Sequence, residues 1–146
     1  MNRGDCIMKL KKAMRILSIL VVLSILLAAT AVAASTRASK YLSAYYATIS
    51  RTSDGDLSIY FQVIAPAKME QLGVSKISVQ RYTGSYWRTE HNFTYPETPE
   101  MQGKNVGVYS GTVVYTPQYP DSSYRAVVTF YASNSSGSDT GSYTAS

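Results

Sequence analysis

A single histidine and two pairs of carboxylates are the residues of this 146-residue chain whose types best suit catalysis or metal binding. His91 lies in "RTEHNF". A Ser-His-Asp arrangement would need a nucleophile and an orienting carboxylate beside it. Nothing in the pattern fixes such partners, so we expect His91 to lie on a solvated strand edge. One histidine is also too few to anchor a zinc site without cysteine ligands.

The carboxylate pairs are better explained by turns and loops. Asp54 and Asp56 flank Gly55 in "SDGDLS", which runs directly into a strand pattern, whereas a calcium loop supplies about six oxygen ligands from alternating positions. Glu97 and Glu100 lie in "YPETPEM", where nothing fixes the separation that a glycosidase requires. We therefore expect no enzymatic activity, no cofactor and no bound metal.

The formal net charge of +5 is concentrated at the start of the chain. The first fifteen residues hold five basic residues and one acidic residue. From Ala34 onward there are nine basic and eight acidic residues, a net charge of +1. This near-neutral balance gives no electrostatic basis for nucleic-acid binding. The only cysteine, Cys6, lies before the apolar segment described next, so disulfides and thiolate sites are not expected in the rest of the chain.

A secretory signal peptide is predicted over residues 1–33. A basic segment precedes "ILSILVVLSILLAATAVAA", nineteen uncharged residues that end in small side chains. The A-x-A pattern that ends at Ala33 predicts cleavage before Ala34, with cleavage after Ala34 as the alternative, and Met8 is an alternative start. Because nineteen uncharged residues approach the length needed to span a bilayer, a retained membrane anchor is the competing interpretation. We expect a secreted, extracellular protein.

The remaining residues have the size of one domain and the composition of a β-protein, rich in Ser, Thr, Tyr and Val. We expect a flexible leader over 34–43 and a β-sandwich over 44–146. "LSIYFQVIA" alternates apolar and polar residues, as does the segment that begins at Tyr124. Seven antiparallel strands are expected, and no helix is long enough to cover a parallel sheet.

Turn signals separate the expected strands. Asp54-Gly55, Thr83-Gly84-Ser85 and "NSSG" each predict a hairpin. "PAKMEQLG" breaks the alternation, and it is interpreted as a crossover with one turn of helix. "TYPETPEMQGKN" is interpreted as a long loop. Gly107 and Gly111 are expected to mark bulges or places of close approach.

The ending of the chain resembles the F–G hairpin of immunoglobulin-like and fibronectin type III domains. In "YRAVVTFYASNSSGS", Tyr124 begins the strand and Asn and Gly mark the turn. The resemblance implies a tyrosine corner, in which the ring of Tyr124 lies in the core and its hydroxyl bonds to nearby backbone. Three features depart from these families: the spacing to the turn is longer, Trp87 follows the second hairpin, and the antibody-type cysteines are absent.

The segment from about Tyr41 to Ser146 more closely resembles a family of small exported proteins of clostridia-like bacteria. The resemblance is carried by "GVSKISVQ" and "VVTFYASNSSGSDT". Those proteins share a signal peptide and a domain of unknown function. The resemblance implies export and fold, and it implies no activity.

Exposed aromatic residues are the remaining candidate site. If the strands that carry Tyr82 and Tyr131 are neighbours, these two residues and Trp87 form an exposed aromatic strip suited to stacking on a sugar or anchoring a protein. The alternative is that Tyr simply favours sheet faces. The sequence therefore favours a non-catalytic extracellular binding module for carbohydrate or protein. A self-assembling structural component, or a membrane-anchored surface protein, is the alternative.

Overall fold

Alternating apolar and polar residues form eight β-strands in residues 39–146, the part of the chain that the computed structural model describes. The strands are β1 (Ala44–Arg51), β2 (Leu57–Met69), β3 (Gln71–Tyr82), β4 (Trp87–Thr94), β5 (Gln102–Gly103), β6 (Val106–Tyr115), β7 (Tyr124–Asn134) and β8 (Gly137–Ala145). The expectations for the signal segment, for its cleavage beside Ala33 and for the start at Met8 lie outside the described residues.

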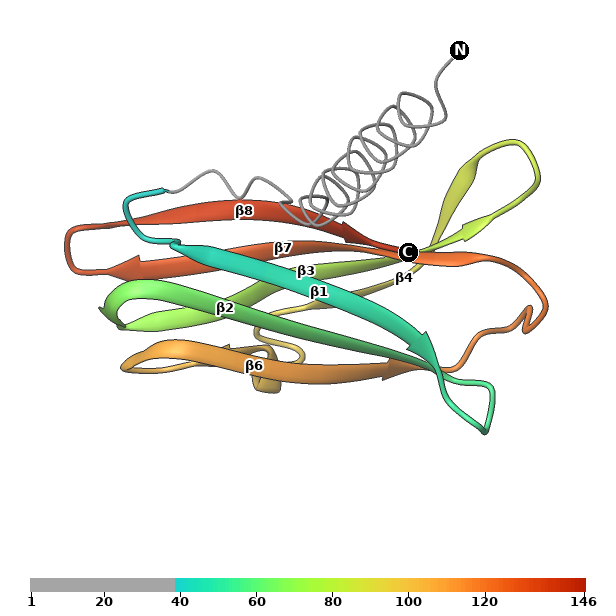
Figure 1. The fold of residues 1–146 in the computed structure, drawn as a ribbon, viewed down its shortest axis with the longest axis horizontal. Coiled ribbons are helices and arrows are strands. Elements are labelled where there is room, and N and C mark those ends of the chain that lie inside the picture. Colours follow the sequence, from blue (N-terminus) through green and yellow to red (C-terminus); the bar gives the residue numbers. More distant parts are fainter. Residues whose placement is uncertain (1–38) are drawn as a thin grey trace, which may run out of the picture. The chain divides into compact units, whose positions relative to one another are not determined.

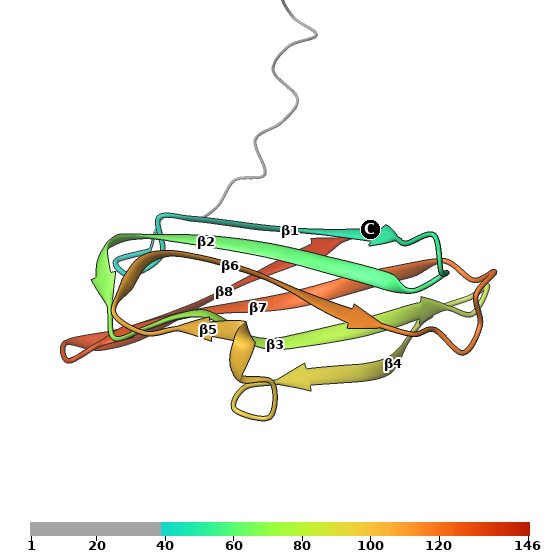
Figure 2. The same ribbon diagram turned by 90° about the horizontal axis from the view of Figure 1, so that it is seen from below.

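Two antiparallel sheets pack face to face as a β-sandwich. One sheet has the order β1-β2-β6, and the other has the order β4-β3-β7-β8, with β5 added to β3. Figure 1 shows the strands running along the long direction of the domain, and Figure 2 shows the two layers in side view. The expected all-β class with antiparallel sheets is confirmed, and the expected count of seven strands is wrong. A 3₁₀ turn, η1 (Pro99–Met101), and the short β5 lie where a long loop was expected.

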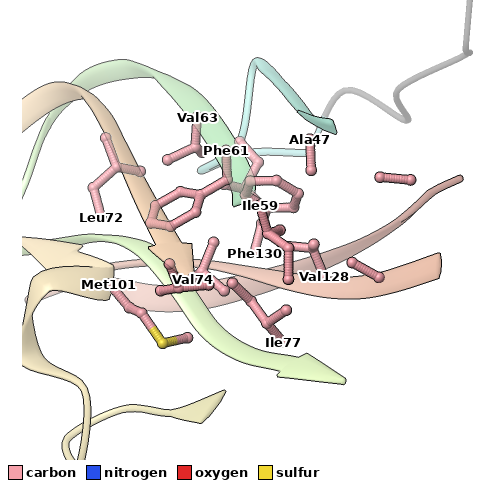
Figure 3. Packing of buried hydrophobic residues seen from close by; sticks show 14 of the residues in the cluster. Ala47, Ile59, Phe61, Val63, Leu72, Val74, Ile77, Met101, Val128 and Phe130 are labelled. Carbon is pink, nitrogen blue, oxygen red and sulfur yellow. The ribbon is translucent and has the colours of Figure 1, made fainter. Parts of the chain in front are cut away.

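The inner faces of both sheets form one apolar core. Along β2, the inward residues are buried and their neighbours in sequence are not, which confirms the alternation. The same holds along β7 from Tyr124 to Ala132. The rings of Phe61 and Phe130 lie between the layers, among the side chains shown in Figure 3. Burying an aromatic ring of this size is worth roughly 2–3 kcal/mol, so these two residues make a large contribution to holding the sheets together.

The crossover expected at "PAKMEQLG" exists, because β2 and β3 belong to different sheets, but the helical turn expected in it is wrong. β2 continues to Met69 and β3 begins at Gln71, with no helical turn between them. Pro66 is tolerated because the pairing of β2 with β6 shifts between Ile64 and Met69, so the missing N–H of Pro66 removes no ladder hydrogen bond. Pattern reasoning missed this because it treats a proline as the end of a strand.

The packed domain begins before residue 44, so the expected flexible leader is wrong for its last residues. Tyr41 and Leu42 are buried in the core. The hydroxyl of Tyr41 donates a hydrogen bond to the carbonyl of Ser136 at 3.0 Å, and the N–H of Ser43 donates to the carbonyl of Ile64 at 2.8 Å. An apolar pair preceding a strand is a weak signal in sequence, yet here it closes one end of the core.

Two glycines support the expected turns and one supports a close approach. Gly55 and Gly84 adopt φ values of +90° and +91°, which confirms the hairpin turns at both places. Gly111 lies opposite Phe61 on the neighbouring strand, and a Cβ there would lie 2.6 Å from the phenyl ring. The close approach expected at Gly111 is therefore confirmed.

Candidate functional site

A β-bulge in β4 lies at one end of the β4-β3-β7-β8 sheet, where an inner ion pair and an outward group of side chains around Trp87 lie on opposite faces. Val79 pairs with His91 and Gln80 pairs with Thr89, so Glu90 is the extra residue of β4. The bulge brings Glu90 to Arg81, whose Nε lies 2.9 Å from the carboxylate, and both side chains are mostly buried (15% and 12% exposed). A bulge re-aims side chains in this way because one strand must accommodate two residues against one.

Aromatic rings close over this ion pair. The guanidinium of Arg81 lies 4.1 Å from the ring centre of Tyr119, which is within the range of a cation–π contact. The hydroxyl of Tyr124 donates a hydrogen bond to the carbonyl of Tyr119 at 3.2 Å. The hydrogen bond holds the backbone of Tyr119 in place while its ring covers Arg81. The ion pair of Arg81 with Glu90 then joins β4 to β3 on the inner side of the sheet.

The outer face of the same region presents a connected set of five side chains, which we call the Trp87 platform: Gln80, Tyr82, Trp87, Thr89 and Arg125. Tyr82 pairs across the strands with Trp87, and their ring centres are 5.3 Å apart. The guanidinium of Arg125 lies 4.4 Å from the ring centre of Trp87. The platform therefore draws on three neighbouring strands, β4, β3 and β7.

Hydrogen bonds fix the polar members of the platform. Arg125 Nε donates to Gln80 Oε1 at 2.8 Å, and Gln80 Nε2 donates to Thr89 Oγ1 at 3.3 Å. Farther along β3, Ser78 Oγ donates to Asn92 Oδ1 at 2.7 Å. Each outward polar side chain on this part of β3 therefore has a partner on an adjacent strand. Such cross-strand pairs hold side chains in one arrangement before any ligand arrives.

A cavity of about 380 Å³ adjoins the platform at the end of the sandwich. Its lining comes from β1, β2, β4, the segment before β7 and the end of β8: Ile49, Ser50, Arg51, Leu57, Trp87, Ser122, Ser123, Tyr124 and Ser146. Trp87 belongs to both the platform and the cavity. Arg51 is held at the rim, with Nη1 donating to the carbonyl of Gly55 at 2.8 Å and Nη2 to that of Ser122 at 3.4 Å. The volume lies in the range of small-ligand sites.

The aromatic strip predicted from sequence is wrong in one of its three members. Tyr82 and Trp87 are in contact, but Tyr131 pairs with Gly73, whereas Tyr124 pairs with Arg81. Seven residues separate Tyr124 from Tyr131 along β7, a distance of about 23 Å. Because β3 and β7 are antiparallel, the end of β3 meets the start of β7. Tyr131 therefore lies far from the platform.

Three members of the platform were missed by the sequence analysis: Gln80, Thr89 and Arg125. The signal for Gln80 was present, because it shares the outward phase of β3 with Tyr82. Arg125 follows Tyr124, so placing Tyr124 at the start of a strand beside the end of β3 would have predicted that Arg125 lies next to Gln80. Thr89 lies two residues after Trp87 and before the bulge at Glu90, so it shares the outward phase of Trp87 and could have been placed from the hairpin.

The histidine and the acidic residues that were considered for catalysis or metal binding do not lie together in one site. His91 is exposed, and its ring stacks on Tyr115 at 5.7 Å and meets the edge of Phe93 at 4.6 Å. The backbone carbonyl of Asp56 accepts a hydrogen bond from the N–H of Thr52 in the turn at Gly55. The carboxylate of Glu97 accepts a side-chain hydrogen bond from Thr94 Oγ1. Within residues 39–146, no group of three or more His, Cys, Asp or Glu residues is arranged to hold a metal ion.

Comparisons with known proteins identify no relative of this chain. No family model matches the chain, and no curated protein or solved structure is significantly similar to it. In the part of the chain that the structure describes, no helix has the length and apolar character needed to span a membrane. The resemblance to exported clostridia-like proteins stays a prediction.

Proposed function

We propose that this chain is a secreted, non-catalytic binding module whose recognition surface is the Trp87 platform. The observation that carries the proposal is the contact of Trp87 with both Tyr82 and Arg125 on an open sheet face. Tyr82 is 41% exposed despite its large ring. Aromatic rings presented in this way bury much area on contact and lose little side-chain entropy.

Preorganisation is the second support for a binding role. A ligand that meets flexible side chains must order them, at about 0.5–1.5 kcal/mol for each one that is immobilised. Arg125 and Gln80 are already bonded to their neighbours, and the ring of Trp87 already has contacts on two strands. Much of the ordering has therefore been achieved during folding.

An immunoglobulin-like or fibronectin type III-like sandwich is the subclass that we propose for the fold. β2 lies beside β6 in one sheet, and β3, β7 and β8 are consecutive in the other, as strands B-E and C-F-G are in immunoglobulin domains. The hydroxyl of Tyr124 reaches the backbone five residues upstream, as the tyrosine of a tyrosine corner does. In such domains, function resides in surfaces added to a common framework, so the fold alone names no ligand.

Export is proposed from the sequence of residues 1–33, with its basic start, apolar run and small residues before Ala34. If that run is not cleaved, the same module is held at the membrane surface. Either location suits a surface that binds an extracellular carbohydrate or protein.

A binding screen tests the proposed function. The purified protein is incubated with neutral and acidic polysaccharides, peptidoglycan and mucin, and the bound fraction is measured. Trp87→Ala should weaken any binding by about 5- to 30-fold, since contact with an aromatic ring is worth roughly 1–2 kcal/mol and Arg125 loses its support. Tyr86→Ala and Tyr131→Ala are matched controls, because both tyrosines lie outside the platform. Equal loss in all three variants, or no binding to any probe, would contradict the proposal.

Self-association is a second candidate function, and one observation favours it. Apart from Lys68 near the end of β2, no outward side chain of the β1-β2-β6 sheet is charged. This uncharged face consists of Ala44, Tyr46, Thr48, Ser50, Ser58, Tyr60, Gln62, Ile64, Val108, Ser110, Thr112 and Val114. Its two edge strands, β1 and β6, also lack the lysines, prolines or inward charges that commonly protect sheet edges, apart from Arg51 at the end of β1.

The size of the uncharged face argues against a strong dimer. Three strands and about seven residues span roughly 14 by 23 Å, or about 320 Å². Stable complexes bury about 800 Å² on each partner. We therefore rank self-association second. Sedimentation velocity over a wide range of protein concentrations tests it, and a single monomeric species throughout would exclude it.

A further inference from the structure

We infer that the Trp87 platform and the adjoining cavity bind a carbohydrate that carries carboxylate groups, with Arg125 and Arg51 contacting the carboxylates. The inference rests on the proposed function of the platform as a binding surface, and it adds the chemical class of the ligand. It follows from the charges at the site, from the contacts that those charges already make, and from the groups beside them.

The guanidinium of Arg125 is oriented but not neutralised. Its Nε is bonded to Gln80 Oε1, and its guanidinium carbon lies 4.4 Å from the ring centre of Trp87. Within residues 39–146, the ion pairs involve only Arg81, Arg88 and Glu90, so no carboxylate lies within 4.0 Å of Arg125. A guanidinium has five N–H donors, and only one of those of Arg125 makes a side-chain hydrogen bond in this part of the chain. Its outer edge has the fork geometry that suits a carboxylate.

Arg51 supplies a second positive charge at the cavity. Its two Nη atoms donate to backbone carbonyls, which fixes its direction without cancelling its charge. Among residues 39–146, no carboxylate pairs with it within 4.0 Å. None of the side chains that line the cavity is acidic, although Ser146, the last residue of the sequence, also lines it and carries the α-carboxyl group. Trp87 links the two arginines, because it contacts Arg125 and also lines the cavity with Arg51.

A cationic ligand is disfavoured by the same geometry. Quaternary ammonium groups bind to the faces of aromatic rings, but Arg125 already lies over the indole of Trp87. A second cation at that ring would meet the positive charge of Arg125 a few ångströms away. An anion is instead attracted by that charge.

The groups around the arginines favour a sugar over an acidic peptide. Ser50, Ser122 and Ser123 line the cavity, and Gln80 and Thr89 lie on the platform, so hydroxyl and amide groups surround both charges. Such groups pair with the many hydroxyls of a sugar ring. The ring of Tyr82 offers a flat apolar surface beside them. A cavity of about 380 Å³ is large enough for a monosaccharide unit.

The test compares acidic polysaccharides with their own esters. Polygalacturonate, alginate and hyaluronan are each used as the free acid and after methyl esterification, which removes the charge and keeps the backbone. Affinity electrophoresis of the purified protein should show at least tenfold tighter binding to the free acid of at least one polymer. That preference should shrink as NaCl is raised from 50 mM to 500 mM, because salt screens exposed charges.

Substitutions of single arginines show which side chains cause the preference for the free acid over the ester. Arg125→Gln should reduce the acid-over-ester ratio at least fivefold, and Arg125→Lys should restore only part of it, because lysine lacks the planar fork. Arg51→Gln should reduce it less, since both of its Nη atoms are already engaged. Arg88→Gln is the matched control: it removes the same charge from the next residue after Trp87, outside the platform. Circular dichroism and thermal unfolding establish that each variant is folded.

The possible outcomes separate this inference from the proposed function. Equal binding to acid and ester in every pair, with loss in Trp87→Ala, would leave a binding module and overturn the acidic ligand. A reduced ratio in Arg88→Gln equal to that in Arg125→Gln would also overturn it, since only overall charge would matter. Tighter binding to poly-glutamate than to every polysaccharide would overturn the carbohydrate and indicate that the ligand is an acidic peptide. No binding to any acidic or neutral polymer would overturn both proposals.

Discussion

The two outer faces of the sandwich are built on equally regular strands, but their side chains are organised in opposite ways. Around Trp87, outward residues of β4, β3 and β7 are joined by ring contacts and by hydrogen bonds. On the uncharged face, the only aromatic contact is that between Tyr46 and Tyr60, whose ring centres are 5.9 Å apart. Val108 and Val114 are 55% and 54% exposed there.

The difference shows what makes a sheet face suitable for recognition. An uncharged face gains free energy from any apolar contact but does not fix the orientation of its partner, because hydrogen bonds and charges carry specificity. The Trp87 platform combines flat rings with directed donors. It also has structural support from beneath, through the bulge at Glu90 and the covered ion pair with Arg81. Substitutions in each region test that support and the independence of the two faces.

The largest effect is expected from removing the support of the platform. Arg81→Ala should lower the free energy of unfolding by about 3 kcal/mol, because it leaves the mostly buried carboxylate of Glu90 without its partner. Urea denaturation measures the change. Arg88→Ala is the control: its side chain is 62% exposed and its Nε lies 4.0 Å from the same carboxylate, so the loss should be below about 0.5 kcal/mol. Similar losses in both variants would contradict a supporting role for the Arg81–Glu90 pair.

The uncharged face has a different support, the close packing of β6 on β2. Gly111→Ala should lower the free energy of unfolding by about 2 kcal/mol, since the added Cβ would lie 2.6 Å from the ring of Phe61 and 3.2 Å from the carbonyl of Glu100. In a thermal melt this corresponds to a decrease in Tm of about 10 °C. Gly107→Ala, on the same strand, meets only atoms at 3.5 Å or more and should be neutral or slightly stabilising. Equal melting temperatures for the two variants would show that β6 moves away from β2 without cost.

Local pattern was sufficient to predict the inner faces of the long strands. β2 and β7 alternate without interruption, and alternation depends only on the geometry of one strand. The turns at Gly55 and Gly84 were also predictable, because few residues adopt a positive φ. These features need no knowledge of which strand is a neighbour.

The candidate site depends on pairing between strands, which local pattern does not contain. Arg125 meets Gln80 because of the register between β7 and β3, and Tyr131 is carried away from Tyr82 by the same register. The bulge at Glu90 cannot be read from β4 alone, since it exists only relative to β3. The correct pair, Tyr82 and Trp87, was predictable because a short hairpin fixes its own register.

A smaller effect is expected at Tyr124, which lies under the platform. Tyr124→Phe should lower the free energy of unfolding by about 1 kcal/mol at neutral pH, because the carbonyl of Tyr119 loses its hydrogen bond. Chemical denaturation of the two proteins measures it. No change would mean that solvent replaces the lost donor, and that Tyr119 does not depend on Tyr124 for its position over Arg81.

The pH dependence of this variant has a defined sign. Burial raises the pKa of Tyr124, and likewise those of Tyr115 and Tyr109. The unfolded chain then releases these protons first, so the contribution of these tyrosines to stability is constant below a pH of about 10 and is lost as the pH rises above it. Tyr124→Phe should make that loss less steep, measured by denaturation from pH 8 to pH 11. An equal slope in both proteins would show that Tyr124 does not contribute.

The smallest effect on stability is expected from charging the uncharged face. In the double variant Val108→Lys/Val114→Lys, the free energy of unfolding should change by less than about 0.5 kcal/mol, because both side chains point to solvent on an edge strand. Val113→Lys is the opposite control, since Val113 is buried one residue away and a lysine there should unfold the protein. Binding at the Trp87 platform should be unchanged in the double variant, because neither valine belongs to the platform or lines the adjoining cavity. Any self-association of the protein should disappear, since lysines on an edge strand oppose pairing with a second copy. Weaker ligand binding by a folded, monomeric double variant would show that the two faces are coupled.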